Sequence, residues 1–295
     1  MKRVLLTGGS GFIGRNLADS HLARAYDLLV PTHAELDLCD DGQVRRYLKS
    51  QKIDVVIHTA VKPSHRNAPD PTRILYANTR MFFTLARNAD CFSRLITTGS
   101  GAVYDASHYR PCMAEGFFDE HVPEDELGFS KYITMKFIEN APFPAVDLRL
   151  FGIFGPYEDY AIRFISNAIC KTLFGLPITL KQNRRFSYLY VKDLPRIMEM
   201  FVENDVAARA YNVAPPEPIE LLDIAHLVKR ITRSDAPVLV SHEGLGSDYT
   251  ADSSLLLRNF PGVSFTPMED AIRELHAWYG ARMHLVRREL LVVDK

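Results

Sequence analysis

The chain has 295 residues, of which 47% are hydrophobic and 11% aromatic, so it can bury the core of one large domain or of two moderate ones. Its 35 basic and 36 acidic residues nearly cancel and form no run of one sign, which argues against nucleic acid and against an anionic membrane surface as partners. The expected partners are small molecules and further copies of the chain.

The four cysteines lie far apart in the sequence and form no CxxC pair. Neither a disulfide framework nor a zinc site is therefore expected, and no metal site is predicted. The N-terminus passes directly into an apolar run without the pattern of a signal peptide, and no stretch reaches the ~18 apolar residues of a membrane span. These features predict a cytoplasmic protein.

The first fourteen residues, MKRVLLTGGSGFIG, combine a short apolar run, a glycine-rich turn and the start of a helical pattern. Gly8 permits a sharp turn, Gly11 lets backbone N–H groups approach a pyrophosphate, and Gly14 lets the helix lie close to the strand. A turn that serves packing alone is the less favoured alternative, because strand, glycines and helix occur together. A dinucleotide is therefore expected at Gly8, Gly11, Phe12, Ile13 and Gly14.

The run at 26–30 predicts a second strand, which Pro31 ends. In an NAD-binding fold an acidic residue after this strand would hold the adenosine ribose hydroxyls, but Thr32 and His33 stand there. Without a carboxylate to repel a 2′-phosphate, and with Arg15 close behind the glycine turn, the expected cofactor is NADP or NAD with a small preference for NADP. The alternative, that Thr32 and His33 are ordinary loop residues, carries equal weight.

The stretch TGGSGFIG also resembles the first motif of the extended short-chain dehydrogenase/reductase family, the NAD-dependent epimerase/dehydratase group that acts on nucleotide sugars. Later segments are similar to that family's patterns in the same order: ELDLCD at 35–40, DVVIHTA at 54–60, SGAVYD at 100–105, GFSK at 128–131, LRLFGIFGP at 148–156, YLYVKDL at 188–194 and YNV at 211–213. The resemblance implies an α/β fold, with a Rossmann-type doubly wound parallel sheet and a smaller C-terminal substrate domain.

The resemblance also implies a division of the chain. Residues 1–155 would form the dinucleotide-binding domain, with a returning segment near 184–203 whose strand at 188–194 rejoins the main sheet. Residues 156–183 and 204–295 would form the smaller domain.

Further cofactor contacts follow from the resemblance. They would come from Asp37, Leu38, Thr59, Ala60 and Val61. Asn78 would tie its helix to the neighbouring strand, and His58 is expected to be a packed residue at a strand end rather than a catalyst.

Alignment on the Val103–Tyr104 pair puts the family's active-site hydroxyl on Ser100. In the dehydratase branch an Asp-Glu pair directly precedes this Val-Tyr, whereas Gly101 and Ala102 stand here. The carboxylates that would protonate and expel a hydroxyl group are therefore absent.

The segment at 127–131 resembles the family's YGxSK motif, but Leu127 replaces the tyrosine. In the family this phenol exchanges a proton with the substrate oxygen, and a lysine one helical turn later lowers its pKa and holds the ribose. Lys131 is present. Tyr132 is a poor substitute, because one helical residue turns a side chain by about 100°. The remaining candidates for the proton donor are Tyr104, His108, His121 and Lys131, and the sequence does not rank them.

The smaller domain would bind the substrate. Arg163, Arg185 and Tyr104 are the candidates beside Ser100, with solvated surface charge as the equal alternative for Arg185. Gly152 stands where the family commonly has an asparagine that contacts the sugar or its phosphates.

Two functions remain open at this stage. The first is a reductase or epimerase that transfers hydride at a ring carbon of a nucleotide-activated sugar, with Ser100 and Lys131 as its catalytic residues. The second is an NAD(P)-binding protein without redox turnover, such as a sensor or an inactive partner subunit. The apolar helices near 72–89 and 127–140 would form a homodimer interface, as in the family.

Overall fold

The computed structural model describes residues 1–65 and 67–292, and its larger part is a parallel sheet of six strands in the order β10-β5-β4-β3-β1-β2. The strands are β1 (Arg3–Thr7), β2 (Asp27–Leu29), β3 (Val55–His58), β4 (Arg94–Ser100), β5 (Ala145–Leu150) and β10 (Ala210–Val213). The four central strands, β1, β3, β4 and β5, are almost entirely buried because both of their faces are covered, and β4 and β5 include buried polar residues such as Thr97, Asp147 and Arg149.

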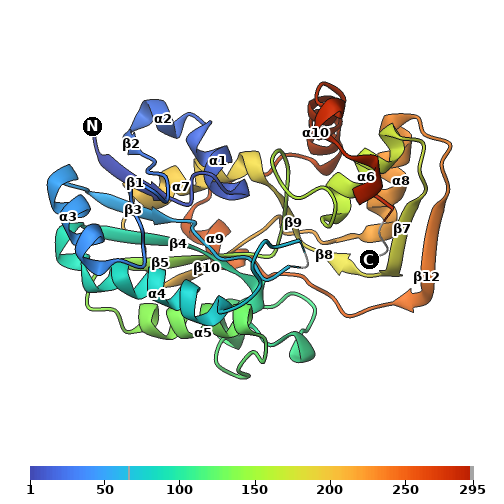
Figure 1. The fold of residues 1–295 in the computed structure, drawn as a ribbon. Helices are drawn as coiled ribbons and strands as arrows, with labels where there is room; N and C mark the ends of the chain where they lie inside the picture. Colours follow the sequence, from blue (N-terminus) through green and yellow to red (C-terminus); the bar gives the residue numbers. More distant parts are fainter. Residues whose placement is uncertain (66, 293–295) are drawn as a thin grey trace.

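Helices cover this sheet on both sides (Figure 1). One face carries α1 (Phe12–Ala18), α2 (Leu22–Ala25), α7 (Leu194–Glu203) and α9 (Ser254–Asn259). The other face carries α3 (Asp41–Gln51), α4 (Ile74–Arg87) and α5 (Glu126–Glu139). The two apolar layers confirm the expected doubly wound architecture, in which ligands bind at the carboxyl ends of the strands.

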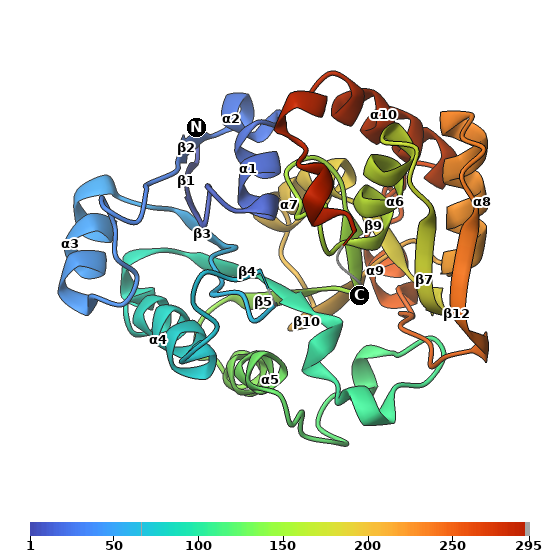
Figure 2. The same ribbon diagram turned by 45° about the vertical axis from the view of Figure 1, so that its right-hand side comes forward.

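A smaller lobe lies beside those carboxyl ends (Figure 2). Its core forms among α6 (Phe164–Leu173), α8 (Leu221–Thr232) and α10 (Met268–Gly280). Three two-stranded sheets complete it: β7 (Ile178–Asn183) with β12 (Val238–Leu245), β8 (Arg185–Phe186) with β11 (Ile219–Glu220), and β6 (Gly152–Phe154) with β9 (Tyr188–Tyr190).

The strand topology differs from the expected one at two places. The strand at 188–194 was expected to rejoin the main sheet, and this is wrong: β9 pairs with β6 in a small sheet of its own, and only the following α7 packs on the large sheet. Conversely, β10 lies in the segment expected to form the smaller domain, yet it pairs in parallel with β5. Its four residues are all buried, because β10 shares the apolar layers of the large sheet. In the described part of the chain, no helix is long and apolar enough to cross a membrane.

Candidate active site

The glycine turn between β1 and α1 is closely packed against the end of β3. Gly8 has a φ of +75°, and a Cβ on it would lie 2.6 Å from the backbone nitrogen of Ala60. A Cβ on Gly14 would lie 2.2 Å from the carbonyl oxygen of Gly8, while Gly11 is the residue that precedes α1. Side chains at these positions would fill the cradle, so the turn fits the close approach of a pyrophosphate. Phe12 and Ile13 begin α1 directly behind it.

The segment after β3 lies against this turn. The hydroxyl of Thr59 donates to the carbonyl oxygen of Thr7 at 2.7 Å, and Val61 is 46% exposed. Asn78 of α4 accepts a hydrogen bond from the backbone nitrogen of Lys62 at 2.7 Å and donates to its carbonyl oxygen at 3.2 Å. Asn78 therefore ties α4 to the segment that follows β3.

His58 closes β3 in the same region and is buried. Its Nδ1 lies 2.8 Å from the hydroxyl of Thr7. Burial, with a smaller contribution from the charge of Lys131, lowers the pKa of His58 to about 3. The ring stays neutral at ordinary pH and packs as the sequence predicted.

The region expected to hold the adenosine contains a carboxylate that the sequence analysis missed. The backbone nitrogen and hydroxyl of Thr32 both donate to Oε2 of Glu35, at 2.7 and 2.8 Å, and these bonds lower the pKa of Glu35. His33 is largely exposed. Arg15 turns toward the other lobe, where its guanidinium carbon lies 3.9 Å from the centroid of the Tyr157 ring. The Glu35 carboxylate thus lies beside Thr32, although Glu35 stands three residues later in the sequence than the acidic residue that usually follows the second strand.

Asp37 and Leu38 follow this carboxylate. Leu38 is buried, and an oxygen of Asp37 accepts a hydrogen bond from the backbone nitrogen of Cys39 at 2.8 Å. The turn they form leads directly into α3.

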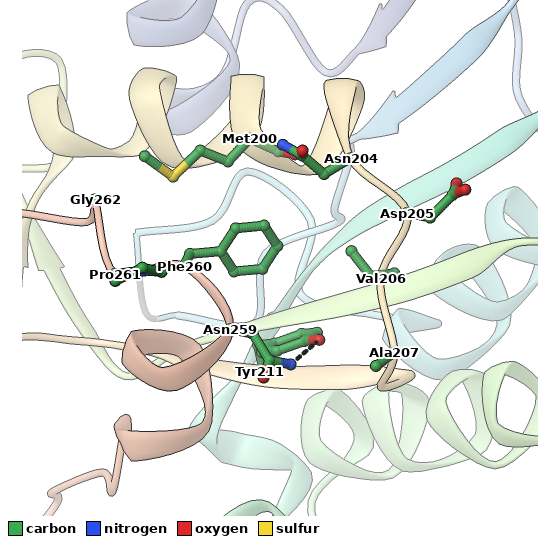
Figure 3. A pocket seen from close by; sticks show the side chains of 10 residues that line it. All are labelled: Met200, Asn204, Asp205, Val206, Ala207, Tyr211, Asn259, Phe260, Pro261 and Gly262. Carbon is green, nitrogen blue, oxygen red and sulfur yellow. Dashed lines mark hydrogen bonds between the residues drawn. The ribbon is translucent and has the colours of Figure 1, made fainter.

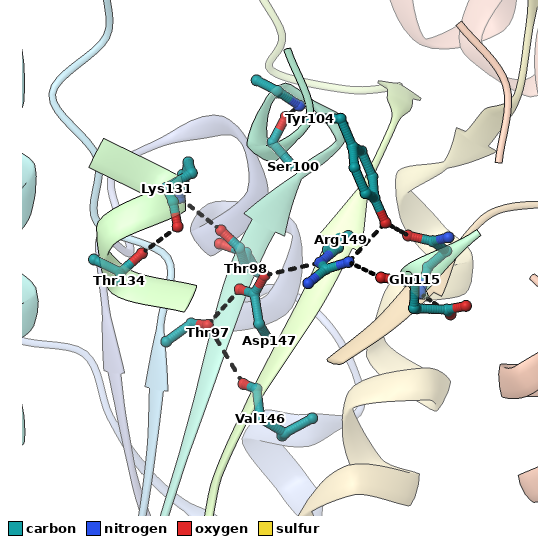
Figure 4. Close-up of polar contacts among 12 residues, drawn as sticks. Thr97, Thr98, Ser100, Tyr104, Glu115, Lys131, Thr134, Val146, Asp147 and Arg149 are labelled. Atoms are coloured by element: carbon teal, nitrogen blue, oxygen red, sulfur yellow. Dashed lines mark hydrogen bonds and ion pairs between the residues drawn. The ribbon is translucent and has the colours of Figure 1, made fainter. Parts of the chain in front are cut away.

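Ser100 and Lys131 meet at the carboxyl end of β4. The Ser100 hydroxyl oxygen accepts a hydrogen bond from the backbone nitrogen of Ala102 at 3.1 Å. The ammonium of Lys131, on α5, donates to the carbonyl oxygen of Thr98 at 2.9 Å (Figure 4). Burial lowers the pKa of Lys131, and the carboxylate of Asp147 acts in the opposite direction.

A buried polar network lies beneath these two residues (Figure 4). The hydroxyl of Thr97 donates to Asp147 at 2.6 Å, and the guanidinium of Arg149 lies 3.8 Å from the same carboxylate. Arg149 also donates to the hydroxyl of Tyr104 at 2.6 Å. Burial raises the pKa of Asp147, against the effect of the neighbouring cations.

Tyr104 is held by this network. Its ring is buried, and its hydroxyl lies 3.2 Å both from the Asn212 side-chain oxygen and from the carbonyl oxygen of Ala114. The hydroxyl points toward Arg149 rather than toward Ser100 (Figure 4). Tyr104 therefore supports the site from below instead of facing a ligand.

The other candidates for the missing phenol also have partners of their own. The rings of His108 and His121 stack at 3.6 Å, and His108 forms an ion pair with Asp105. Tyr132 donates its hydroxyl to Asp119, away from Lys131, as its position on the helix predicted.

Two tyrosines of the smaller lobe reach into the site, and the sequence analysis missed both. A Cβ on Gly101 would lie 2.7 Å from the hydroxyl oxygen of Tyr249, so this phenol lies beside the residue that follows Ser100, and the Ser100 side chain acts to lower the pKa of Tyr249. A Cβ on Gly152 would lie 2.7 Å from Cδ1 of Tyr188. The sequence signal was the pair of glycines at positions where the resembled family carries side chains.

Arg163 and Arg185, the two arginines expected to bind substrate, have different surroundings in the structure. Arg163 precedes α6, is exposed, and its charge acts on Tyr249, as does that of Arg184. Arg185 instead forms an ion pair with Asp248 at 3.0 Å. Arg163 and Arg184 are therefore the cations whose charges act on Tyr249, and Arg184 also donates to the carbonyl oxygen of Ser247 at 2.8 Å.

Two hollows lie at the other end of the sheet, where β4, β5 and β10 begin. One of about 430 Å³ lies between the end of α7 and the residues after α9, beside Tyr211 and Asn259 at the amino end of β10 (Figure 3). Another of about 730 Å³ lies at the amino ends of β4 and β5. Neither is lined by Ser100 or Lys131. In the described ranges no group of three or more histidine, cysteine or acidic residues could hold a metal ion.

Comparisons with known proteins agree with this geometry. The chain is 24% identical over 257 residues to the GDP-L-fucose synthase of Azorhizobium caulinodans, covering 78% of this chain and 80% of that protein. It is 31% identical over 106 residues to the GDP-L-colitose synthase of Yersinia pseudotuberculosis, covering 35% and 34%. The structure of a GDP-mannoheptose C4 reductase from Campylobacter jejuni with NADP bound superposes with a TM-score of 0.81, at 17% identity over 95% of this chain and 98% of that one. The sequence profile of one family matches residues 4–214, and the chain belongs to that family, the NAD dependent epimerase/dehydratase family.

Proposed function

We propose that the protein is an NAD(P)-dependent oxidoreductase that reduces a keto group on a nucleotide-activated sugar. The observation that carries the proposal is the meeting of Ser100 and Lys131 at the carboxyl end of β4, on the same sheet edge as the glycine turn. Binding at this edge is the rule for doubly wound sheets. The residues proposed to hold the dinucleotide are those of the glycine turn, the segments at 32–38 and 59–61, and Lys131, with Asn78 fixing the second segment.

The reaction needs a hydride, which a bound nicotinamide supplies. The chain itself binds and orients the reactants. Ser100 donates its hydroxyl proton in a hydrogen bond to the carbonyl oxygen, which stabilises the negative charge that develops there. Lys131 is fixed by the carbonyl of Thr98, and its remaining protons would be available to hold the ribose hydroxyls of a bound dinucleotide.

The residues that follow Ser100 favour reduction over dehydration. Gly101 and Ala102 form a short 3-10 turn there, so neither of these neighbours carries a carboxylate to protonate a departing hydroxyl. The names of the relatives support the same substrate class, since they include sugar-nucleotide synthases and a C4 reductase. Arg163 and Arg184 are suited to the diphosphate of such a substrate.

We further propose NADP(H) as the preferred cofactor, a homodimer as the assembly and the cytoplasm as the location. NADP is bound in two of the similar solved structures, and the four cysteines, which form no disulfide, suit a reducing compartment. The dimer proposal rests on α4 and α5, which pack side by side and carry the partly exposed rings of Phe83 and Phe137. Light scattering at micromolar concentration tests it, and a strictly monomeric species contradicts it.

A second candidate is a dinucleotide-binding protein without turnover. Leu127 is the observation in its favour, because it removes the phenol that normally transfers the proton. Both candidates predict dinucleotide binding, and Gly11→Val should abolish it by steric conflict with the pyrophosphate, as measured by calorimetry.

The experiment that separates the two candidates is an assay of reduced-cofactor oxidation. Its ketone panel contains dTDP-4-dehydrorhamnose and UDP-4-keto-6-deoxy-D-glucose, the sugar types in the names of two relatives, and UDP-glucose tests epimerisation. We expect turnover of at least one ketone by the wild-type protein. Ser100→Ala should lower kcat by about 10²–10³-fold, the cost of losing one donor to a developing oxyanion. Ser107→Ala, on an exposed turn, is the matched control.

A further inference from the structure

The site retains the serine and the lysine of its family but has no phenol on α5. Reduction of a ketone consumes one proton for each hydride, so some group must supply that proton to the oxygen that Ser100 contacts. The donor must therefore lie within hydrogen-bond reach of the Ser100 hydroxyl or of the oxygen bound to it.

We infer that Tyr249, from the smaller lobe, is the general acid of the reaction. Its phenol lies at Ser100, and it fills the space beside Gly101 that a side chain would otherwise take. This inference rests on the proposed function, and it assigns the missing role to a residue outside the family's motif.

The position of Tyr249 is fixed by backbone pairing. Its nitrogen donates to the carbonyl oxygen of Arg185 at 2.9 Å, and its carbonyl oxygen accepts from the nitrogen of Ser187 at 3.1 Å. The following Ala251 nitrogen donates to the Ser187 hydroxyl at 3.1 Å. A donor mounted on such a paired segment is held in place before the substrate arrives.

Three aromatic rings hold the phenol ring in its direction. The centroid of Tyr249 lies 5.0 Å from that of Phe151, 5.2 Å from Tyr109 and 5.5 Å from Phe186. Tyr109 is the nearest competing phenol, but its hydroxyl donates to the carbonyl oxygen of Gly101 at 3.3 Å. The Tyr249 hydroxyl instead lies beside the α-carbon of Gly101, next to Ser100 in the chain.

The surroundings of the phenol suit donation rather than abstraction of a proton. Burial raises the pKa of Tyr249 to about 12, and Ser100, Arg163 and Arg184 act against that increase while Tyr104 adds to it. The phenol therefore remains protonated at neutral pH, as an acid must be before reduction. An oxidation would need the phenolate, so this environment favours the reductive direction.

The proton step balances as follows. The O–H bond of Tyr249 breaks and a new O–H bond forms on the carbonyl oxygen, while the carbonyl carbon receives the hydride from the reduced dinucleotide. The products are the alcohol, the oxidised dinucleotide and a phenolate near Arg163 and Arg184. Water returns a proton to the phenolate, because Tyr249 is only partly buried.

The test compares Tyr249→Phe with Tyr132→Phe on whichever ketone the wild-type protein reduces. Tyr249→Phe keeps the ring packing and should lower kcat by about 10²–10⁴-fold, while KM for the sugar and Kd for NADPH change by less than about threefold. Tyr132→Phe removes a phenol that points to Asp119 and should keep kcat within about twofold of wild type. Thermal unfolding of both variants checks that they fold alike.

The pH profile is the second readout. With a phenol of high pKa as the acid, wild-type kcat should stay level between about pH 6 and pH 9, whereas an acid with the ordinary pKa of an imidazole would make kcat fall above about pH 7. A Tyr249→Phe variant that retains wild-type kcat, or a decline above neutral pH, overturns the assignment and leaves the proposed function standing. If the wild-type protein binds the dinucleotide but reduces none of the ketones, the proposed function fails, and the role of Tyr249 fails with it.

Discussion

The ring of Tyr188 occupies the space that a side chain on Gly152 would need. A Cβ at this glycine would lie 2.7 Å from Cδ1 of Tyr188 and 2.9 Å from the carbonyl oxygen of Ser187. The ring in turn stacks on Phe186, with centroids 5.1 Å apart. The glycine in place of the family's asparagine is therefore a packing requirement of this chain, because Tyr188 takes that volume from the other lobe.

Gly152→Ala should destabilise the protein by about 1–3 kcal/mol, the usual cost of overpacking a filled site. One of the two close atoms belongs to the backbone and cannot rotate away. Chemical denaturation measures the loss in the free energy of unfolding. Gly116→Ala is the control, since a Cβ there would meet nothing within 4 Å, and equal behaviour of the two variants would contradict this explanation.

Leu127→Tyr should lower kcat rather than raise it. The family's phenol would return to the first turn of α5, but the site already contains the phenol of Tyr249, and a second one would crowd the same oxygen. Leu127→Phe adds the ring without the hydroxyl. Comparing the two variants therefore separates the effect of side-chain volume on kcat from the effect of proton transfer. A rise in kcat specific to the tyrosine variant, measured by steady-state kinetics, would show that the wild-type protein lacks an acid.

Glu35→Gln should strengthen the proposed preference for NADP(H), because the Glu35 carboxylate on Thr32 acts against that preference. The Glu35 carboxylate accepts two hydrogen bonds from Thr32, and a negative charge at this place repels a 2′-phosphate. We expect the ratio of NADP(H) to NAD(H) affinity to rise by up to about tenfold, by calorimetry. Glu217→Gln, an exposed change in the other lobe, should leave the ratio unaltered. An unchanged affinity ratio in Glu35→Gln would indicate that the adenosine part of the cofactor does not bind beside Glu35.

Acid should weaken the fold through His58. Its native pKa of about 3 lies below the ordinary value of 6.5, so between these values the unfolded chain binds one proton more than the native one. The free energy of unfolding should therefore fall as pH decreases from 6.5, by up to about 1.4 kcal/mol per pH unit. Above pH 6.5, His58 should not make the free energy of unfolding depend on pH. His58→Gln should make this slope shallower, while the exposed His242→Gln should not. Identical slopes in denaturation series would contradict the assignment.

The large sheet could be predicted from sequence because its strands are short apolar runs that end in recognisable turns. The position of β9 could not, because YLYV reads as a buried strand whichever partner it has, and pairing with β6 depends on contacts between distant segments. Ser100 and Lys131 became candidates through their resemblance to the family's motifs, and their roles stay predictions. Tyr249 did not, since it lies over a hundred residues from either and only the folded chain brings its hydroxyl to Ser100.

The placement of β10 also determines how the chain can be divided. This strand follows the first part of the smaller lobe and precedes α8, β12 and α10, yet it covers the outer edge of β5 through four paired positions. A fragment that ends before residue 210 would leave the backbone groups of β5 without partners, and such an edge is a template for association with other chains. On the ribosome the large sheet therefore stays incomplete until more than two thirds of the chain, including the first part of the smaller lobe, has been made.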